Sequence, residues 1–285
     1  MATSRRPTYA RVICPGWKIV LASFQSSLIF PGAATQGRPE AIVAPIDGGE
    51  IITLTAPYGA KPRDTITALF GRALTRFGAP HPEASLRPTL LYFYGNGMCL
   101  ADCVDDFRAL RRRGFNLMVA EYLGYGMSGG KPSEQGVYAT ADTCFDHLLT
   151  RGDIDPKRIV PIGWSIGAAA AIHLASTRPV PRLVVISAFT SMADLAHRLF
   201  PFLPTSRLLV YRFDNEQKLR GVKAPIFIAH GTRDGIIPFE MSRRLAAAAA
   251  GPVVQHDVNG GDHNDVFDVG GTALAEAIDR FVNEV

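Results

Sequence analysis

Hydrophobic and polar positions alternate along this chain between two patterns: short runs of β-branched and aromatic residues, and longer stretches with helical spacing. This alternation is typical of a largely parallel sheet covered by helices. The pattern predicts strands at Ile42–Ile46, Glu50–Ala56, Thr89–Tyr94, Asn116–Tyr122, Arg158–Gly163, Leu183–Ser187, Pro225–His230 and Val253–Val258. It predicts helices at Asp64–Phe77, before Arg113, and at Ser133–Thr150, Ile166–Thr177, Phe239–Ala250 and from about Thr272 onward.

Turn residues refine this pattern in two places. Asp47-Gly48-Gly49 separates the first two predicted strands and predicts a hairpin. Pro161 lies inside a predicted central strand, where it cannot donate to the ladder, so we expect a local bulge there. The chain shows no internal repeat and no long linker. We therefore expect a helical or extended segment at residues 1–40, followed by one α/β domain at residues 41–285.

Composition narrows the classes of partner. The chain has 285 residues, 47% of them hydrophobic, which is enough to bury a large core. A net charge of +4, from 30 basic and 26 acidic residues, is too small to indicate a nucleic-acid partner. The sparse cysteines include Cys99 and Cys103, four residues apart but without a CxxC motif or a histidine companion. They are interpreted as reduced structural thiols rather than metal ligands.

The N-terminal residues contain an apolar stretch, Ile19–Phe30, which is interrupted by Gln25. It does not reach the roughly 18 consecutive apolar residues of a membrane span, so no integral span is expected. A short amphipathic helix that lies on the domain or on a bilayer surface fits the pattern better. The sequence favours a cytoplasmic location over export, with peripheral membrane contact as an open alternative.

The motif Gly-x-Ser-x-Gly occurs twice, around Ser128 and around Ser165. A nucleophile elbow requires a strand that runs directly into a helix, so that a tight turn exposes the serine hydroxyl. Ser165 lies between a predicted strand and the predicted helix Ile166–Thr177, whereas Ser128 precedes Gly-Gly-Lys-Pro, which does not favour a helix. The context favours Ser165 as the nucleophile.

A serine hydroxyl needs a base to take its proton and an acid to orient that base. Asp234 and His263 each follow a predicted strand, in the chain order serine, acid, histidine. The carboxyl ends of parallel strands share one edge of the sheet, so Ser165, Asp234 and His263 are predicted to meet there as a catalytic triad. Asp194 is an alternative acid.

Two backbone N–H groups are predicted to bind the oxyanion of the reaction. The first belongs to Ile166, directly after the nucleophile. The second comes from the glycine turn after strand Thr89–Tyr94, where Asn96 is favoured and Gly97 or Met98 are alternatives.

Two further histidines receive structural interpretations. His173 lies inside a helical pattern and is expected to be a packing residue. His230 is expected to brace the turn that follows its strand.

These residues resemble the α/β-hydrolase superfamily. More narrowly, they are similar to small-cap serine hydrolases that include the bud-emergence-type and depalmitoylase-type α/β-hydrolase-domain proteins. The resemblance runs from about residue 40 to the end and implies a mostly parallel eight-stranded sheet with a short cap at residues 190–223. The matching stretches are Tyr92–Met98, Glu121–Ser128, Ile162–Gly167, Phe200–Pro204, Phe213–Asn215, His230–Pro238 and Gly261–Asp265.

The sequence departs from the family pattern at three places. Tyr94 stands where the family usually has histidine, which leaves the bracing of the oxyanion loop open. Leu123 stands where the family usually has arginine. The segment Pro57–Pro88 looks longer than usual and would add a lobe near the active-site edge.

Together the motifs and the resemblance predict a serine hydrolase that cleaves small esters or thioesters through an acyl-enzyme and requires no metal or cofactor. The cap is expected to present an apolar inner face that suits an acyl chain. Its residues would be Phe200, Phe202, Leu203, Leu208 and Tyr211.

Two alternative functions remain at this point. The first is a serine peptidase on the same fold, although no paired acidic motif offers a site for a free amine. The second is a non-catalytic binding protein, although no member of the predicted triad is missing.

Overall fold

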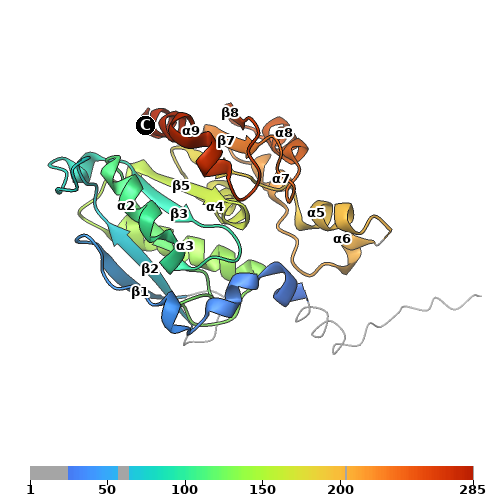
Figure 1. Cartoon of the computed structure of the whole chain (residues 1–285), viewed down its shortest axis with the longest axis horizontal. Coiled ribbons are helices and arrows are strands. Elements are labelled where there is room, and N and C mark those ends of the chain that lie inside the picture. Colours follow the sequence, from blue (N-terminus) through green and yellow to red (C-terminus); the bar gives the residue numbers. More distant parts are fainter. Residues whose placement is uncertain (1–24, 57–63, 203, 285) are drawn as a thin grey trace, which may run out of the picture.

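The computed structural model describes residues 25–56, 64–202 and 204–284. Within them, eight strands form one sheet in the order β1-β2-β4-β3-β5-β6-β7-β8 (Figure 1). β2 pairs antiparallel with β1 and β4, and the remaining neighbours are parallel, which confirms the predicted mostly parallel sheet. The strands are β1 Glu50–Thr55, β2 Thr65–Gly71, β3 Thr89–Phe93, β4 Asn116–Ala120, β5 Ile159–Trp164, β6 Leu183–Ile186, β7 Ile226–Gly231 and β8 Val253–Val258.

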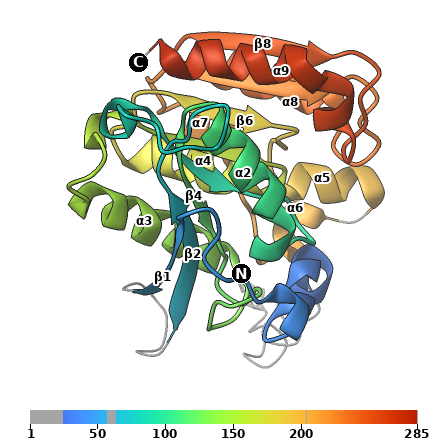
Figure 2. The same ribbon diagram turned by 60° about the vertical axis from the view of Figure 1, so that its left-hand side comes forward.

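Helices cover both faces of the sheet (Figure 2). On one face α3 contacts α4, α4 contacts α7, and α7 contacts α8. On the other face lie α2 and α9, which are joined by an ion pair between Arg113 and Asp279. The helices are α2 Val104–Arg112, α3 Glu134–Thr150, α4 Ile166–Thr177, α5 Met192–Leu199, α6 Thr205–Leu208, α7 Asn215–Leu219, α8 Phe239–Ala248 and α9 Val266–Asn283.

The first two strands of the sheet differ from the sequence prediction. The predicted helix Asp64–Phe77 is wrong, because Thr65–Gly71 forms β2 and pairs on both sides. The predicted strand Ile42–Ile46 is also wrong, since these residues have no ladder partner. The turn at Asp47-Gly48 does form, but β1 pairs with β2 instead of the residues before the turn. The pairing of alternating β-branched residues with two neighbours outweighs their local helical spacing.

Pro161 is accommodated in β5 without the expected bulge, because the register between β5 and β3 is continuous. The Ser165 N–H donates to the Ile186 carbonyl of β6. Backbone groups alternate in direction along a strand, so the nitrogen of Pro161, four residues earlier, also faces β6. Pairing with β6 begins only at Ile162 and Val184, one residue later. The missing N–H thus falls just outside the β5–β6 ladder.

The described part of the N-terminal segment packs on the body of the protein. Residues 25–29 are helical, and Phe30 is buried against the rings of Tyr211 and Phe213. Residues 19–24 of the predicted amphipathic stretch lie outside the described residues. No helix in the described ranges is both long and apolar enough to cross a membrane.

The segment predicted to form an extra lobe contributes to the sheet instead. Residues 57–63 lie outside the described part of the chain, while residues 64–88 supply β2 and a 3₁₀ turn at Ala84–Leu86. Cys99 and Cys103 are free, buried thiols, as predicted.

Candidate active site

Ser165 occupies a sharp turn between β5 and α4. Its backbone has φ 57° and ψ −117°, a conformation that is uncommon for a residue with a side chain. Gly163 and Gly167 make the turn possible. A Cβ at Gly163 would collide with the Gly167 carbonyl, and one at Gly167 would collide with the carbonyl of Phe93. The two motif glycines are therefore required by close backbone contacts on either side of Ser165.

A continuous hydrogen-bond chain joins the three predicted residues of the triad. His263 Nε2 lies 3.0 Å from Ser165 Oγ, and His263 Nδ1 lies 2.8 Å from Asp234 Oδ2. Because the carboxylate only accepts, Nδ1–H donates to Asp234, which leaves Nε2 to accept from the serine hydroxyl. All three side chains are buried. Residues 98 positions apart in the chain thus meet at the edge where β5, β7 and β8 end.

Asp234 is held as a carboxylate by several donors. The N–H groups of Ile236 and Ile237 donate to Oδ1 at 2.9 and 2.7 Å, and the His230 ring lies 3.2 Å from Oδ2. Burial raises the pKa of Asp234, but the hydrogen bonds from His230, His263 and Ile237 outweigh it and hold the pKa well below its usual range. His230 also contacts the Ile237 carbonyl at 2.9 Å, so it braces its turn as predicted. Its contact with Asp234 was not predicted.

The loop that carries His263 is fixed by its own carboxylates. Asp262 Oδ1 accepts from the N–H groups of Gly235 at 2.8 Å and His263 at 2.7 Å, and these bonds lower the pKa of Asp262. Asp265 in turn accepts from the Asp262 N–H. The ring of Trp164 stacks on His263 with a centroid distance of 5.8 Å. The sequence motifs did not identify these supporting residues, which act through contacts between separate loops.

The two alternative site residues have structural partners elsewhere. Ser128 Oγ accepts from the Thr67 N–H at 2.9 Å and donates to the Glu121 carbonyl at 3.0 Å. It therefore ties β2 to the loop after β4. Asp194 Oδ2 lies 2.9 Å from Arg244 and accepts from Thr190, away from the chain of hydrogen bonds at His263.

The loop after β3 lies beside the described N-terminal residues. Asn96 donates its side-chain amide to the Ile29 carbonyl and accepts from the Tyr125 hydroxyl at 2.9 Å. The Gly97 N–H already donates to the Asn96 side chain at 3.1 Å. This bond disfavours Gly97 as an oxyanion donor, and the N–H groups of Asn96 and Met98 stay candidates.

A buried carboxylate braces the same loop. Glu121 Oε1 accepts from the Tyr94 hydroxyl at 2.8 Å and the Leu100 N–H at 2.7 Å, while Oε2 accepts from the Met127 N–H. Burial raises the pKa of Glu121, and the bonds from Met127, Leu100 and Tyr94 oppose that rise. The Tyr122 hydroxyl donates to the Tyr94 carbonyl. Tyr94, the departure from the family pattern, is therefore an anchor of this loop.

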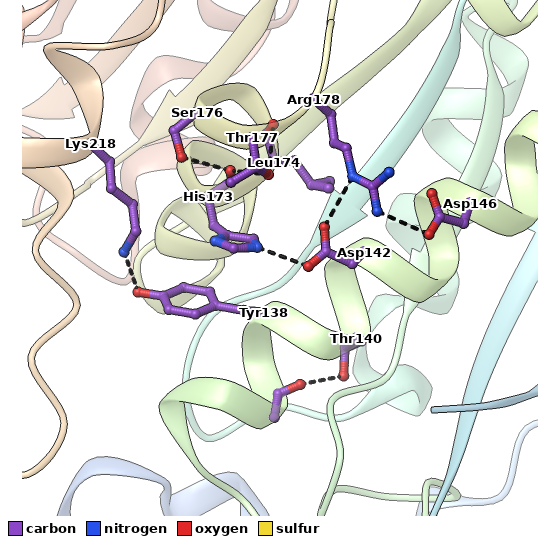
Figure 3. A network of polar contacts seen from close by, with 11 residues as sticks. Tyr138, Thr140, Asp142, Asp146, His173, Leu174, Ser176, Thr177, Arg178 and Lys218 are labelled. Atoms are coloured by element: carbon purple, nitrogen blue, oxygen red, sulfur yellow. Dashed lines mark hydrogen bonds and ion pairs between the residues drawn. The ribbon is translucent and has the colours of Figure 1, made fainter. Parts of the chain in front are cut away.

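A second polar network attaches the cap to the helices below it (Figure 3). Lys218 of α7 donates to the Tyr138 hydroxyl of α3 at 2.6 Å, and the Tyr138 ring stacks on His173 of α4 at 4.3 Å. His173 lies 2.9 Å from Asp142, which also contacts Arg178. Burial lowers the pKa of Lys218 and raises that of Tyr138. The network confirms His173 as a packing residue and ties three helices together.

Three of the five apolar residues expected on the inner face of the cap are exposed to solvent. These three are Phe200, Phe202 and Leu208. Tyr211 packs against Phe30 with a centroid distance of 5.1 Å, and Leu203 lies outside the described residues. Exposure does not decide which of these side chains border the acyl group, so the acyl pocket in the cap stays a prediction.

Comparison with known proteins identifies the class that this fold and site define. A family model described as the alpha/beta hydrolase family matches residues 92–214. Alpha/beta hydrolase domain-containing protein 17B of Xenopus tropicalis is 31% identical over 217 residues, 73% of each chain. The uncharacterized protein Rv2307c of Mycobacterium tuberculosis is 37% identical over 205 residues, 72% of this chain and 73% of the relative.

Solved structures share the fold at lower identity. A Pyrococcus furiosus esterase superposes with a TM-score of 0.62 at 16% identity, over 83% of this chain and 90% of its own. Est1E from Butyrivibrio proteoclasticus, with ferulic acid bound, superposes with a TM-score of 0.63 at 15% identity, over 82% of this chain and 98% of its own. The family model and the relative of known family identify the protein as a hydrolase. It belongs to the alpha/beta hydrolase family.

Proposed function

We propose that the protein is a serine hydrolase that cleaves carboxylic esters or thioesters through an acyl-enzyme. The observation that carries this proposal is the unbroken hydrogen-bond chain from Ser165 Oγ through His263 to Asp234. In this arrangement His263 can take the proton of the serine hydroxyl and hold it on its imidazole ring. Esterases among the proteins of similar fold support the choice of an ester substrate.

In the acylation step His263 Nε2 takes the proton of Ser165 while Oγ attacks the acyl carbon. Asp234 stabilises the imidazolium that forms, because its carboxylate accepts from Nδ1–H. The imidazolium then protonates the leaving alcohol or thiol as the bond to the acyl carbon breaks. A water molecule, activated by the same base, attacks the acyl-enzyme and releases the acid.

The negative charge on the acyl oxygen requires nearby donors. The N–H of Ile166 stands at the start of α4, where the helix dipole favours negative charge. The Asn96 N–H is the proposed second donor, on a loop held by Glu121 and Tyr125. The start of α4 holds the first donor, and the contacts of Glu121 and Tyr125 hold the loop of the second. Donors that are fixed before the reaction stabilise the developing charge without reorganisation.

Labelling with a fluorophosphonate, combined with turnover of a series of nitrophenyl esters and matched anilides, tests this proposal. Wild type is expected to label and to cleave the esters much faster than the anilides. Ser165→Ala should abolish labelling and turnover, whereas Ser128→Ala should retain labelling because Ser128 serves only to tie β2 to its neighbour. Persistent labelling of the Ser165→Ala variant would refute the nucleophile, and faster anilide cleavage would favour a peptidase.

A further inference from the structure

The cap carries an exposed apolar cluster, here called the cap tip. Its side chains are Phe200, Phe202, Leu208 and Val210, with exposed fractions of 56, 97, 41 and 44%. Phe200 and Phe202 lie in the connection between α5 and α6, and Leu208 and Val210 lie at the end of α6 and directly after it. Contiguous exposed apolar side chains on a protein surface commonly mark a site of interaction.

The N-terminal residues extend this cluster. Gln25 donates its side-chain amide to the Leu208 carbonyl at 2.9 Å and accepts from the Val210 N–H at 2.8 Å. The helical residues 25–29 therefore lie beside the cap tip, and among them Leu28 is 66% exposed. Figures 1 and 2 both show these residues and α6 at the same end of the molecule, away from the centre of the sheet.

The stretch of sequence that carries the cap tip is basic. Between Asp194 and Asp214 the sequence contains no acidic residue, while it contains Arg198, Arg207 and Arg212. Arg212 pairs with Asp214. Arg198 and Arg207 are exposed, and neither forms an ion pair with a carboxylate in the parts of the chain that the structure describes. The cap tip thus combines exposed apolar side chains with two exposed arginines of the same segment that have no carboxylate partner among the described residues.

We propose that the cap tip docks on the surface of an anionic lipid bilayer, with its phenylalanines in the interfacial layer and Arg198 and Arg207 at the headgroups. Aromatic and aliphatic side chains flanked by basic residues are the pattern of peripheral interfacial binding. A second copy of this chain fits less well, because symmetric contact of two cap tips would bring like charges together. The proposal is independent of the proposed reaction, because its test reads binding alone.

Sedimentation of the full chain with vesicles tests the docking. Wild type is expected to bind vesicles that contain phosphatidylserine more tightly than vesicles of phosphatidylcholine alone, and to release them in high salt. Phe202→Ser should weaken binding by about tenfold, since burial of a phenylalanine is lost. Phe77→Ser is the matched control, because Phe77 is 81% exposed in the connection between β2 and β3. The double variant Arg198→Gln, Arg207→Gln should remove the preference for phosphatidylserine.

A fluorescent reporter distinguishes insertion from nonspecific adsorption. Phe202→Trp should show a blue-shifted emission when anionic vesicles are added, and Phe77→Trp should not. Equal binding by Phe202→Ser and Phe77→Ser, or the absence of an emission shift, would overturn the proposal. It would also be overturned if wild type failed to bind vesicles but formed a dimer that Phe202→Ser abolished, which would identify a self-association surface.

Discussion

At the scale of single residues, Ser165 has a backbone conformation that conflicts with its side chain. Positive φ outside glycine costs of order 1–3 kcal/mol, and here the neighbours impose it: the Ser165 N–H is fixed on β6, and α4 starts at the next residue. The strain comes from the backbone conformation at position 165, and the serine hydroxyl does not cause it. Substitutions at Ser165 can therefore separate stability from chemistry.

We expect Ser165→Gly to raise the free energy of unfolding by about 1 kcal/mol, because glycine adopts this conformation without strain. Ser165→Ala keeps the Cβ and should show little of that gain, although both variants lose activity. Urea denaturation of wild type, Ser165→Gly and Ser165→Ala measures these differences in the free energy of unfolding. A glycine variant no more stable than the alanine variant would show that the turn is not strained.

Asp234 should make folding stability depend on pH in the acid range. Its pKa is lower in the folded protein than the value of about 3.9 in an unfolded chain. Its stabilising contribution is therefore complete above the unfolded value and is lost as pH falls through the folded value. The difference in unfolding free energy between wild type and Asp234→Asn should be largest at neutral pH and shrink below about pH 4. Asp105→Asn, at an exposed carboxylate, is the control variant.

The same substitution tests the role of Asp234 in turnover. Asp234→Asn should reduce kcat by about 10³–10⁴-fold, because a neutral amide does not stabilise the imidazolium and favours the wrong tautomer of His263. Asp194→Asn should leave kcat almost unchanged, since Asp194 pairs with Arg244 instead. A larger loss in the Asp194 variant would contradict the proposed triad.

At the scale of elements, the loops after β3 and β4 support each other through Glu121 and Tyr94. Tyr94→Phe removes one of the bonds that fix the proposed oxyanion loop, so kcat should fall by about tenfold, the equivalent of one hydrogen bond to a charged group, with little change in KM. Tyr92→Phe, two residues earlier on β3 and near Asp106, is the matched control. Equal effects of the two variants would show that Tyr94 acts only on the stability of β3.

The elements that position the proposed triad could be predicted from sequence because their signals are local. Ser165 lies between a run of β-branched residues and an alanine-rich helix, and α4 begins and ends at its predicted residues. β2 was not predicted, because its strand conformation depends on pairing with two other segments. One of them is β1, and the other is residues 117–120, which are distant from β2 in the chain.

Side-chain direction could not be predicted in the same way. The composition of the cap indicated apolar character but not which side of the cap bears it, and Phe202 faces solvent. The contacts of His230 with Asp234, and of Trp164 with His263, likewise join segments whose spacing carries no motif. Local patterns locate residues at the ends of strands, while tertiary contacts decide what surrounds them.

At the scale of the whole molecule, Phe30 links the N-terminal segment, the cap and the core. Phe30→Ala should lower the free energy of unfolding by about 3–5 kcal/mol, because it leaves a cavity among Tyr211 and Phe213. Leu28→Ala, two residues earlier and largely exposed, should change stability by less than about 0.5 kcal/mol. Denaturation curves for both variants measure this contrast, and similar losses would contradict the structural role of Phe30.

The bonds between Gln25 and the cap join residues 183 and 185 positions apart in the chain. Synthesis proceeds at about 5–20 residues per second, so the N-terminal residues wait roughly 10–40 seconds on the ribosome before these partners emerge. Throughout that interval Phe30 lacks its aromatic neighbours Tyr211 and Phe213. The contact of Ile29 with Asn96 can form much earlier, so the described N-terminal residues reach their partners in two separate stages of synthesis.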